Sequence, residues 1–189
     1  SLTFYYLFIF LLLTTTFFQA WLTKRHINHV ERNRSKVPAP FSQTISIKDH
    51  KKAADYTISK SYIGIIDLFI QAIFLYLITI GGGINMLTDI FGNLTDNKLL
   101  TGSIVIISVM LISSLIDLPL SIYRIFNIDE KFGFNRMTFK IFVADLIKQS
   151  ILSIVIGVPI LLVSLSIISN LGGFWWLWLW VFISFFNFL

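Results

Sequence analysis

The sequence contains no cysteine and few charged residues. Without cysteine it can form no disulfide bond, no thiolate nucleophile and no zinc site with cysteine ligands. Lys, Arg, Asp and Glu together make up 13% of the residues, whereas a typical soluble domain has about 25%. This low charge content excludes an ordinary water-soluble domain.

Hydrophobic residues make up 56% of the chain and are concentrated in five long stretches. A helix needs about 20 residues to cross a hydrocarbon core of about 30 Å, because each residue adds about 1.5 Å. We therefore predict an all-α, polytopic integral membrane protein. Its five transmembrane helices are expected at about residues 2–22, 62–80, 102–122, 148–168 and 174–189.

The two ends of the chain carry further information. The first residue is Ser1 rather than Met, and the last apolar stretch is shorter than the others. From these observations we expect the sequence to be part of a longer polypeptide. The first stretch is expected to stay as a helix rather than to be a cleaved signal peptide, because bulky Lys24 and Arg25 follow it instead of small residues.

Basic residues are distributed unequally between the segments that join these stretches. Segments 24–60 and 124–147 are rich in Lys and Arg, whereas residues 81–101 contain a single basic residue, Lys98. The positive-inside rule places the two basic segments in the cytoplasm, with the amino terminus outside or in a lumen. The membrane would be the bacterial inner membrane or the endoplasmic reticulum. Three consecutive glycines, Gly81 to Gly83, are expected to form a flexible turn on the outer side.

We single out four polar residues within or at the edge of the apolar stretches as candidates. Such groups are costly in a membrane and are candidates for function. Asp67 and Gln71 are four residues apart, so a helix places them on one face. Asp117 precedes Arg124 by seven residues, which allows these two to pair or Arg124 to extend to the interface. The Gly-x-Gly-Asp context of aspartyl intramembrane proteases is absent, so we favour structural pairing or contact with a water-filled interior.

Histidine occurs only at His26, His29 and His50, all in the first basic segment. The metalloprotease motif H-E-x-x-H requires four-residue spacing and a glutamate beside the first histidine. His26 and His29 are three apart and are separated by Ile27 and Asn28. We therefore predict no catalytic residue and no metal ligand in this chain, and we interpret these histidines as interfacial residues.

The second basic segment combines charges with phenylalanines around a glycine. It is too apolar for a solvated linker and too short for a domain. A loop of this kind normally packs against another part of the protein or against a partner. Further along, Asp145 and Lys148 are three apart, as expected of a helical charge pair at the membrane edge. The candidate residues for an interdomain or substrate-orienting loop are Arg124, Glu130, Gly133, Phe134, Asn135 and Thr138.

Several motifs along the chain are typical of one family. The first basic segment contains Val37-Pro38, Phe41 and the run His50-Lys51-Lys52-Ala53-Ala54-Asp55-Tyr56-Thr57. The second basic segment and the residues that flank it contain Asp117-Leu118-Pro119, Tyr123-Arg124, Glu130-Lys131-Phe132-Gly133-Phe134-Asn135-Arg136-Met137-Thr138 and Asp145-Leu146-Ile147-Lys148. From about Trp21 to its end, the sequence resembles the amino-terminal membrane domain of the CAAX prenyl protease type of zinc metalloendopeptidase.

The resemblance implies a domain that helps to enclose a large chamber of helices. In that family, zinc is held by H-E-x-x-H on a later helix and a distant glutamate, and the metal activates water for cleavage near the carboxyl end of substrates. None of those ligands has a counterpart here, so the fragment alone is expected to be inactive and to bind no zinc. The implied partners are the lipid bilayer, a carboxy-terminal protease domain of the same chain and a peptide or protein substrate.

Two other classes of function remain as alternatives. A non-enzymatic scaffold or a transporter-like module could use Asp67 and Asp117 to handle ions or protons, although no inverted repeat is evident. A binder of acidic lipid or nucleic acid could use residues 24–60, but membrane topology already explains that charge, and we expect no nucleic-acid partner. A downstream H-E-x-x-H motif would distinguish the protease from both.

Overall fold

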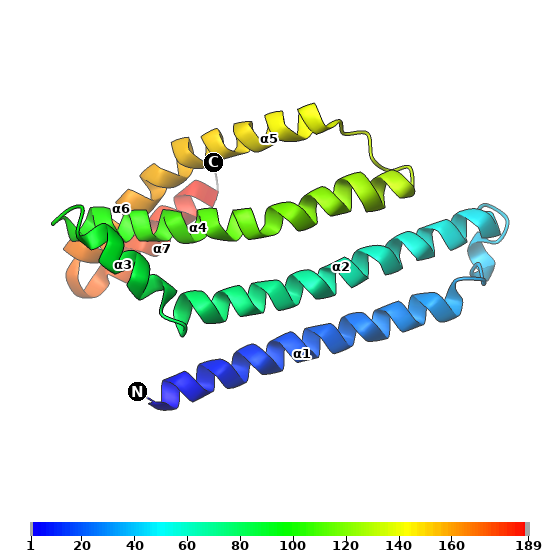
Figure 1. Ribbon diagram of the computed structural model, residues 1–189, viewed down its shortest axis with the longest axis horizontal. Helices are drawn as coiled ribbons and strands as arrows, with labels where there is room; N and C mark the ends of the chain where they lie inside the picture. Colours follow the sequence, from blue (N-terminus) through cyan, green and yellow to red (C-terminus); the bar gives the residue numbers. More distant parts are fainter. Residues whose placement is uncertain (1, 188–189) are drawn as a thin grey trace. The chain divides into compact units, whose positions relative to one another are not determined.

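The computed structural model describes residues 2–187 of the chain, and all of their regular secondary structure is helical (Figure 1). No strand occurs among these residues. The α-helices are α1 (Leu2–Asn33), α2 (Ile47–Thr79), α3 (Gly83–Gly92), α4 (Lys98–Tyr123), α5 (Phe139–Leu152), α6 (Val158–Asn170) and α7 (Trp175–Asn187).

Some of these helices run into one another without a break. A π-helical turn, Arg124–Asp129, extends α4, and a second one, Ser153–Gly157, joins α5 to α6. The result is four continuous helices long and apolar enough to cross a membrane, at Leu2–Asn33, Ile47–Thr79, Lys98–Asp129 and Phe139–Asn170. A shorter apolar helix covers Gly172–Phe186. The predicted class, an all-α polytopic membrane protein, is therefore confirmed.

The first two long helices extend well beyond their apolar stretches, which were placed at residues 2–22 and 62–80. α1 continues to Asn33, and α2 already begins at Ile47. Hydropathy marks only the part of a helix that lies in lipid, whereas backbone hydrogen bonds can continue into the polar segment. Ser46 fixes the start of α2, because its hydroxyl accepts a hydrogen bond from a backbone N–H of the first turn at 3.1 Å.

The fourth long helix also begins earlier than its apolar stretch at 148–168. α5 begins at Phe139, inside the basic segment 124–147, and Thr138 caps it by accepting a hydrogen bond from the Ile141 N–H at 3.3 Å. A threonine at this position satisfies one of the free backbone donors of the first turn. The last predicted helix, 174–189, corresponds to α7, although residues 188–189 lie outside the described residues.

The turn at the three glycines leads into a helix that the sequence did not predict. Gly82 has φ +83°, a conformation that favours glycine, and α3 begins at the next residue. Gly81 has no room for a side chain, because an added Cβ would lie 2.7 Å from the Leu77 carbonyl oxygen. α3 has only 10 residues, too few to be recognised as a membrane span.

The chain divides into two compact units. The first comprises residues 2–83 and 111–136, and the second comprises residues 84–110 and 137–187. In the first unit α1 and α2 lie side by side and antiparallel, and the π-helical turn after α4 packs on α2 (Figure 1). In the second unit α6 packs against α7.

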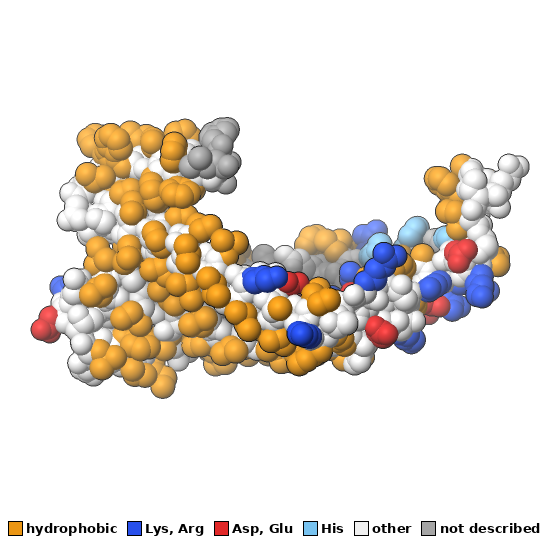
Figure 2. Space-filling model, turned by 90° about the horizontal axis from the view of Figure 1, so that it is seen from above, with side chains coloured by type: hydrophobic (Ala, Val, Ile, Leu, Met, Phe, Trp, Pro, Cys, Tyr) orange, Lys and Arg blue, Asp and Glu red, His pale blue; other side chains and the backbone are white. Residues whose placement is uncertain are grey.

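Few side chains are buried within either unit. In the most apolar window of Phe139–Asn170, no residue is buried. Hydrophobic side chains cover much of the face in Figure 2, while most of its Lys, Arg and His side chains gather in one part. An apolar surface of this extent is stable against lipid but not against water. The buried hydrophobic residues of the first unit are Ile27, Ala54, Ile78, Ile128 and Phe132.

Candidate functional site

Three polar residues of α2 face the antiparallel segment formed by α4 and its π-helical turn. Tyr56, Asp67 and Gln71 are separated by eleven and four residues, so a helix places all three on one face. Their partners on the opposite segment are Asp129, Arg124 and Asp117, in that order. We call these six residues the polar ladder. It joins segments that lie far apart in the sequence.

The first contact lies within the membrane part of the ladder. The Gln71 amide Nε2 donates a hydrogen bond to Asp117 Oδ1 at 2.5 Å. Asp117 thus contacts α2, and neither of the two alternatives considered for Arg124, pairing with Asp117 or extension to the interface, includes this contact. Sequence spacing had shown that Asp117 and Arg124 share a face, but it could not show that α2 would present a different partner to each of them.

Arg124 instead approaches Asp67. Its Nη2 lies 3.9 Å from Asp67 Oδ2, and both side chains are about one-third exposed, at 35% and 33%. The other carboxylate oxygen, Asp67 Oδ1, is buried and has no hydrogen-bond partner among the residues that the structure describes. An oxygen that is buried without a donor is costly. Asp67 is thus the least satisfied member of the ladder.

Tyr56 forms the end of the ladder nearest the basic segments. Its hydroxyl donates a hydrogen bond to Asp129 Oδ1 at 2.8 Å and accepts one from Lys60 Nζ at 3.2 Å. Its ring also contacts two phenylalanines of the loop that follows Asp129, with 5.5 Å between ring centres for Phe132 and 4.7 Å for Phe134. Tyr56 therefore holds the loop against α2 by both polar and aromatic contacts.

The loop is shaped by its own hydrogen bonds. The backbone N–H groups of Phe134 and Asn135 both donate to the Asp129 carbonyl oxygen, at 2.8 and 3.1 Å. Gly133 has φ +72°, which explains why glycine occupies the turn. The Asn135 amide donates to Glu130 Oε2 at 2.8 Å. Of the predicted loop residues, Glu130, Gly133, Phe134 and Asn135 lie in or beside this compact turn, whereas Arg124 belongs to the preceding π-helical turn and Thr138 caps α5.

The apolar content of the loop is divided between two environments. Phe132 is 7% exposed, whereas Phe134 is 56% exposed even though one side of its ring meets Tyr56. Lys52 Nζ lies 5.7 Å from the ring centre of Phe134. Part of the loop therefore docks on α2 of its own chain, and Phe134 leaves apolar surface free. Sequence reasoning named Tyr56 only within the family-like run His50 to Thr57 and not as a site residue, although its eleven-residue spacing from Asp67 places both on one helix face.

Two further ion pairs lie outside the ladder. Arg34, just after α1, donates two hydrogen bonds to the Asp55 carboxylate of α2, at 2.5 and 2.7 Å. These bonds and the negative charge raise the pKa of the Arg34 guanidinium above its usual value, so Arg34 stays charged at any working pH. On α5, Lys148 Nζ lies 3.8 Å from Asp145 Oδ1, and both side chains are well exposed.

The residues described here offer no cluster of three or more His, Cys, Asp or Glu side chains that could hold a metal ion. His50 Nε2 lies 3.1 Å from the Asn33 carbonyl oxygen, which ties the start of α2 to the end of α1. His26 and His29 both border a hollow on the surface of α1.

Comparison with known proteins gives the family. The family model described as the CAAX prenyl protease amino-terminal domain, with five membrane helices, matches residues 26–189. The chain belongs to this family.

Individual relatives agree with this assignment. A CAAX prenyl protease 1 homolog of Oryza sativa is 38% identical over 87 residues, covering 46% of this chain and 20% of that protein. The Arabidopsis thaliana homolog is 28% identical over 153 residues, covering 77% of this chain and 36% of that protein. The chain thus spans about a third or less of these relatives' length.

A solved structure has the same fold. The crystal structure of S. mikatae Ste24p matches 93% of this chain and 42% of its own, with a TM-score of 0.84 and 23% identity. The helix arrangement of the family is therefore present in this chain. At this level of identity the likeness concerns the fold alone.

Proposed function

We propose that this chain is the membrane domain of an integral-membrane zinc endopeptidase that cleaves near the carboxyl end of CAAX-type substrates. Its membership of the CAAX prenyl protease amino-terminal family carries this proposal. Its similarity to CAAX prenyl protease 1 homologs of Oryza sativa and Arabidopsis thaliana agrees with it. Family membership favours this function over a scaffold or a transporter-like module.

The catalytic zinc would be held by residues outside this chain, because the described side chains include no suitable donor set. The domain, taken as residues 1–189, would contribute confinement and positioning within a chamber of helices. It would work with a carboxy-terminal protease domain of its own polypeptide. We expect the isolated chain to have no peptidase activity.

We propose that the exposed part of the loop orients the substrate or contacts the protease domain. Phe134 supports this role, since it keeps about half of its surface free while Tyr56 contacts its ring and its backbone N–H is bonded to the Asp129 carbonyl oxygen. Asn135 and Glu130 form a polar pair beside it. Thr138 ends the loop as the cap of α5. A side chain presented by a fixed turn is better suited to positioning a peptide than one on a free linker.

The experiment replaces Phe134 and Asn135 by Ala in the complete protein. Peptide turnover should fall roughly tenfold or more, because misplacement of substrate is costly, while membrane insertion stays intact. The matched control is Phe41→Ala, since Phe41 is 54% exposed and lies outside the loop. Equal turnover in the two variants would refute the role of the loop but not the protease assignment.

The proposed orientation places the amino terminus outside or in a lumen and both basic segments in the cytoplasm. The excess of Lys and Arg in residues 24–60 and 124–147 supports it. Single cysteines can test the orientation in a cysteine-free background. A thiol at Ser35 should react from the cytoplasmic side with a membrane-impermeant maleimide, and one at Asp96 should react from the other side.

A further inference from the structure

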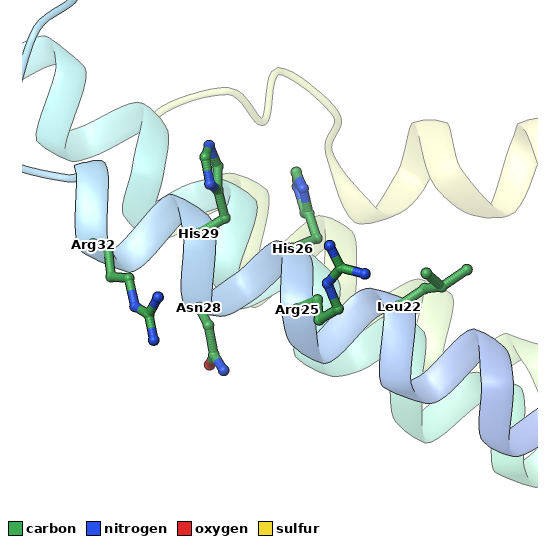
Figure 3. A pocket seen from close by; sticks show the side chains of 6 residues that line it. All are labelled: Leu22, Arg25, His26, Asn28, His29 and Arg32. Atoms are coloured by element: carbon green, nitrogen blue, oxygen red, sulfur yellow. The ribbon is translucent and has the colours of Figure 1, made fainter.

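One face of α1 carries four basic side chains just beyond the apolar part of the helix. Arg25, His26, His29 and Arg32, together with Leu22 and Asn28, border a hollow of about 500 Å³ (Figure 3). At about 100° per residue, these six positions fall within an arc of roughly 160°. The volume is within the range of about 300–1,000 Å³ that is typical of small-ligand sites.

The basic groups around this hollow have few partners. His26 and Arg32 form no hydrogen bond or ion pair with any residue in the range 2–187. Arg25 lies over the ring of Trp21, 4.9 Å from its centre, and His29 Nε2 lies 3.4 Å from the Asn33 amide nitrogen. None of the six lining residues is acidic. The hollow therefore offers guanidinium and imidazole donors without a negative charge to receive them.

The position of this face along α1 indicates what occupies it. The apolar part of the helix ends at Leu22, and Trp21 is typical of the membrane interface. Arg25 to Arg32 then rise through about 10 Å, which overlaps the headgroup layer of about 5–7 Å on each side of the hydrocarbon. A phosphate at this depth comes from the lipid itself.

We infer that this face of α1 binds the anionic headgroup of a phospholipid. The two guanidinium groups supply forked donors that match phosphate oxygens, and Leu22 lies where the glycerol and acyl chains begin. The charge of the face and the absence of acidic residues among those that line the hollow favour an acidic lipid over a zwitterionic one. This role does not depend on peptide hydrolysis, so it stands or falls separately from the protease assignment.

The test uses the complete protein, purified in detergent with phosphatidylglycerol or with phosphatidylcholine, and native mass spectrometry to measure the lipid retained. The variant Arg25→Gln/Arg32→Gln should bind phosphatidylglycerol about 30-fold more weakly, at roughly fivefold for each lost cation. The matched control, Lys24→Gln/Lys48→Gln, removes the same charge from exposed positions outside the hollow. It should change binding by less than about twofold.

A second variant keeps the charge but removes the forked geometry. Arg25→Lys/Arg32→Lys should give an intermediate loss of phosphatidylglycerol binding, because an ammonium group cannot make the bidentate contact. This variant also carries the test if the glutamine variant fails to fold, as judged by helical circular dichroism. Unchanged binding in Arg25→Lys/Arg32→Lys and in the glutamine variant would overturn the proposal.

Other outcomes would also overturn it. Equal losses in the glutamine variant and in its control would mean diffuse electrostatic attraction rather than a site. Displacement of phosphatidylglycerol by an equal concentration of inorganic phosphate would identify free phosphate as the ligand. Unchanged lipid binding together with a raised KM for a peptide that has a free carboxyl terminus would identify the substrate carboxylate as the occupant.

Discussion

The two units of the chain differ in the kind of contact that joins their helices. In residues 2–83 and 111–136, polar side chains connect segments far apart in sequence: Arg34 with Asp55, Tyr56 with Asp129, Asp67 with Arg124, and Gln71 with Asp117. In residues 84–110 and 137–187, the side-chain bonds described above are local, as between Asp145 and Lys148. α6 and α7 of that unit contain no charged residue.

This difference indicates how far the side chains of each unit determine which of its helices become neighbours. Lipid is as apolar as leucine, so apolar side chains alone give little preference for one helix neighbour over another. The polar ladder supplies that preference in the first unit, because its intramembrane members Asp67, Gln71 and Asp117 would be unsatisfied if they faced lipid. The second unit must obtain its helix positions from close packing and from whatever surrounds it.

The largest effect is expected at Arg124. Replacing Arg124 by Leu leaves the Asp67 carboxylate without its cation and should lower the free energy of unfolding by about 2 kcal/mol, less than for a fully buried pair because both side chains are about one-third exposed. Unfolding in mixed micelles with increasing SDS, followed by circular dichroism, measures this. The double variant Arg124→Leu/Asp67→Leu should recover part of the loss, and no recovery would mean that the two residues do not interact.

Gln71 should have the next largest effect. Gln71→Leu removes the donor to Asp117 Oδ1 and should cost about 1.5 kcal/mol, since an intramembrane carboxylate loses its partner. The same SDS titration applies. Gln71→Asn is the control. Its amide is as polar as that of glutamine, but its side chain is one methylene shorter and does not reach Asp117 Oδ1 in the same geometry. Equal stability of wild type and Gln71→Leu would remove this contact from the ladder.

Substitutions at Tyr56, at the other end of the polar ladder, separate the polar from the aromatic contribution to stability. Tyr56→Phe loses the bonds to Asp129 and Lys60 but keeps the ring against Phe132, so it should cost about 1 kcal/mol. Tyr56→Ala should cost more, because the aromatic contacts are lost as well. Faster tryptic cleavage after Lys131 would report opening of the loop. If both variants are cleaved at the wild-type rate, Tyr56 does not hold the loop.

The smallest effect is expected in the second unit. Lys148→Ala breaks an exposed pair at 3.8 Å and should change the free energy of unfolding by less than about 0.5 kcal/mol. SDS titration beside Arg124→Leu gives a direct comparison. A loss at Lys148 as large as that at Arg124 would show that local surface pairs matter as much as the ladder, and the contrast between the two units would then be wrong.

The sequence allowed the helical membrane class and the family to be predicted, because both follow from long apolar runs and local motifs. It could not give the full helix lengths, since Asn33 and Ile47 lie in polar sequence where hydropathy carries no signal. It placed Asp67 and Gln71 on one face but could not choose their partners. That choice depends on how α2 and α4 are set against each other, which is a tertiary property.

The π-helical turn at Arg124–Asp129 has a consequence for the length of the chain there. A π-helix closes each hydrogen bond over one residue more than an α-helix, so each residue turns through less than the usual 100°. Asp129 thereby comes round toward the side already occupied by Asp117 and Arg124. An ordinary α-helical turn would keep Asp129 on this side only if one residue fewer separated it from Arg124. The conformation of this turn and its number of residues are thus linked, because a change in either one alone would rotate Asp129 away from Tyr56.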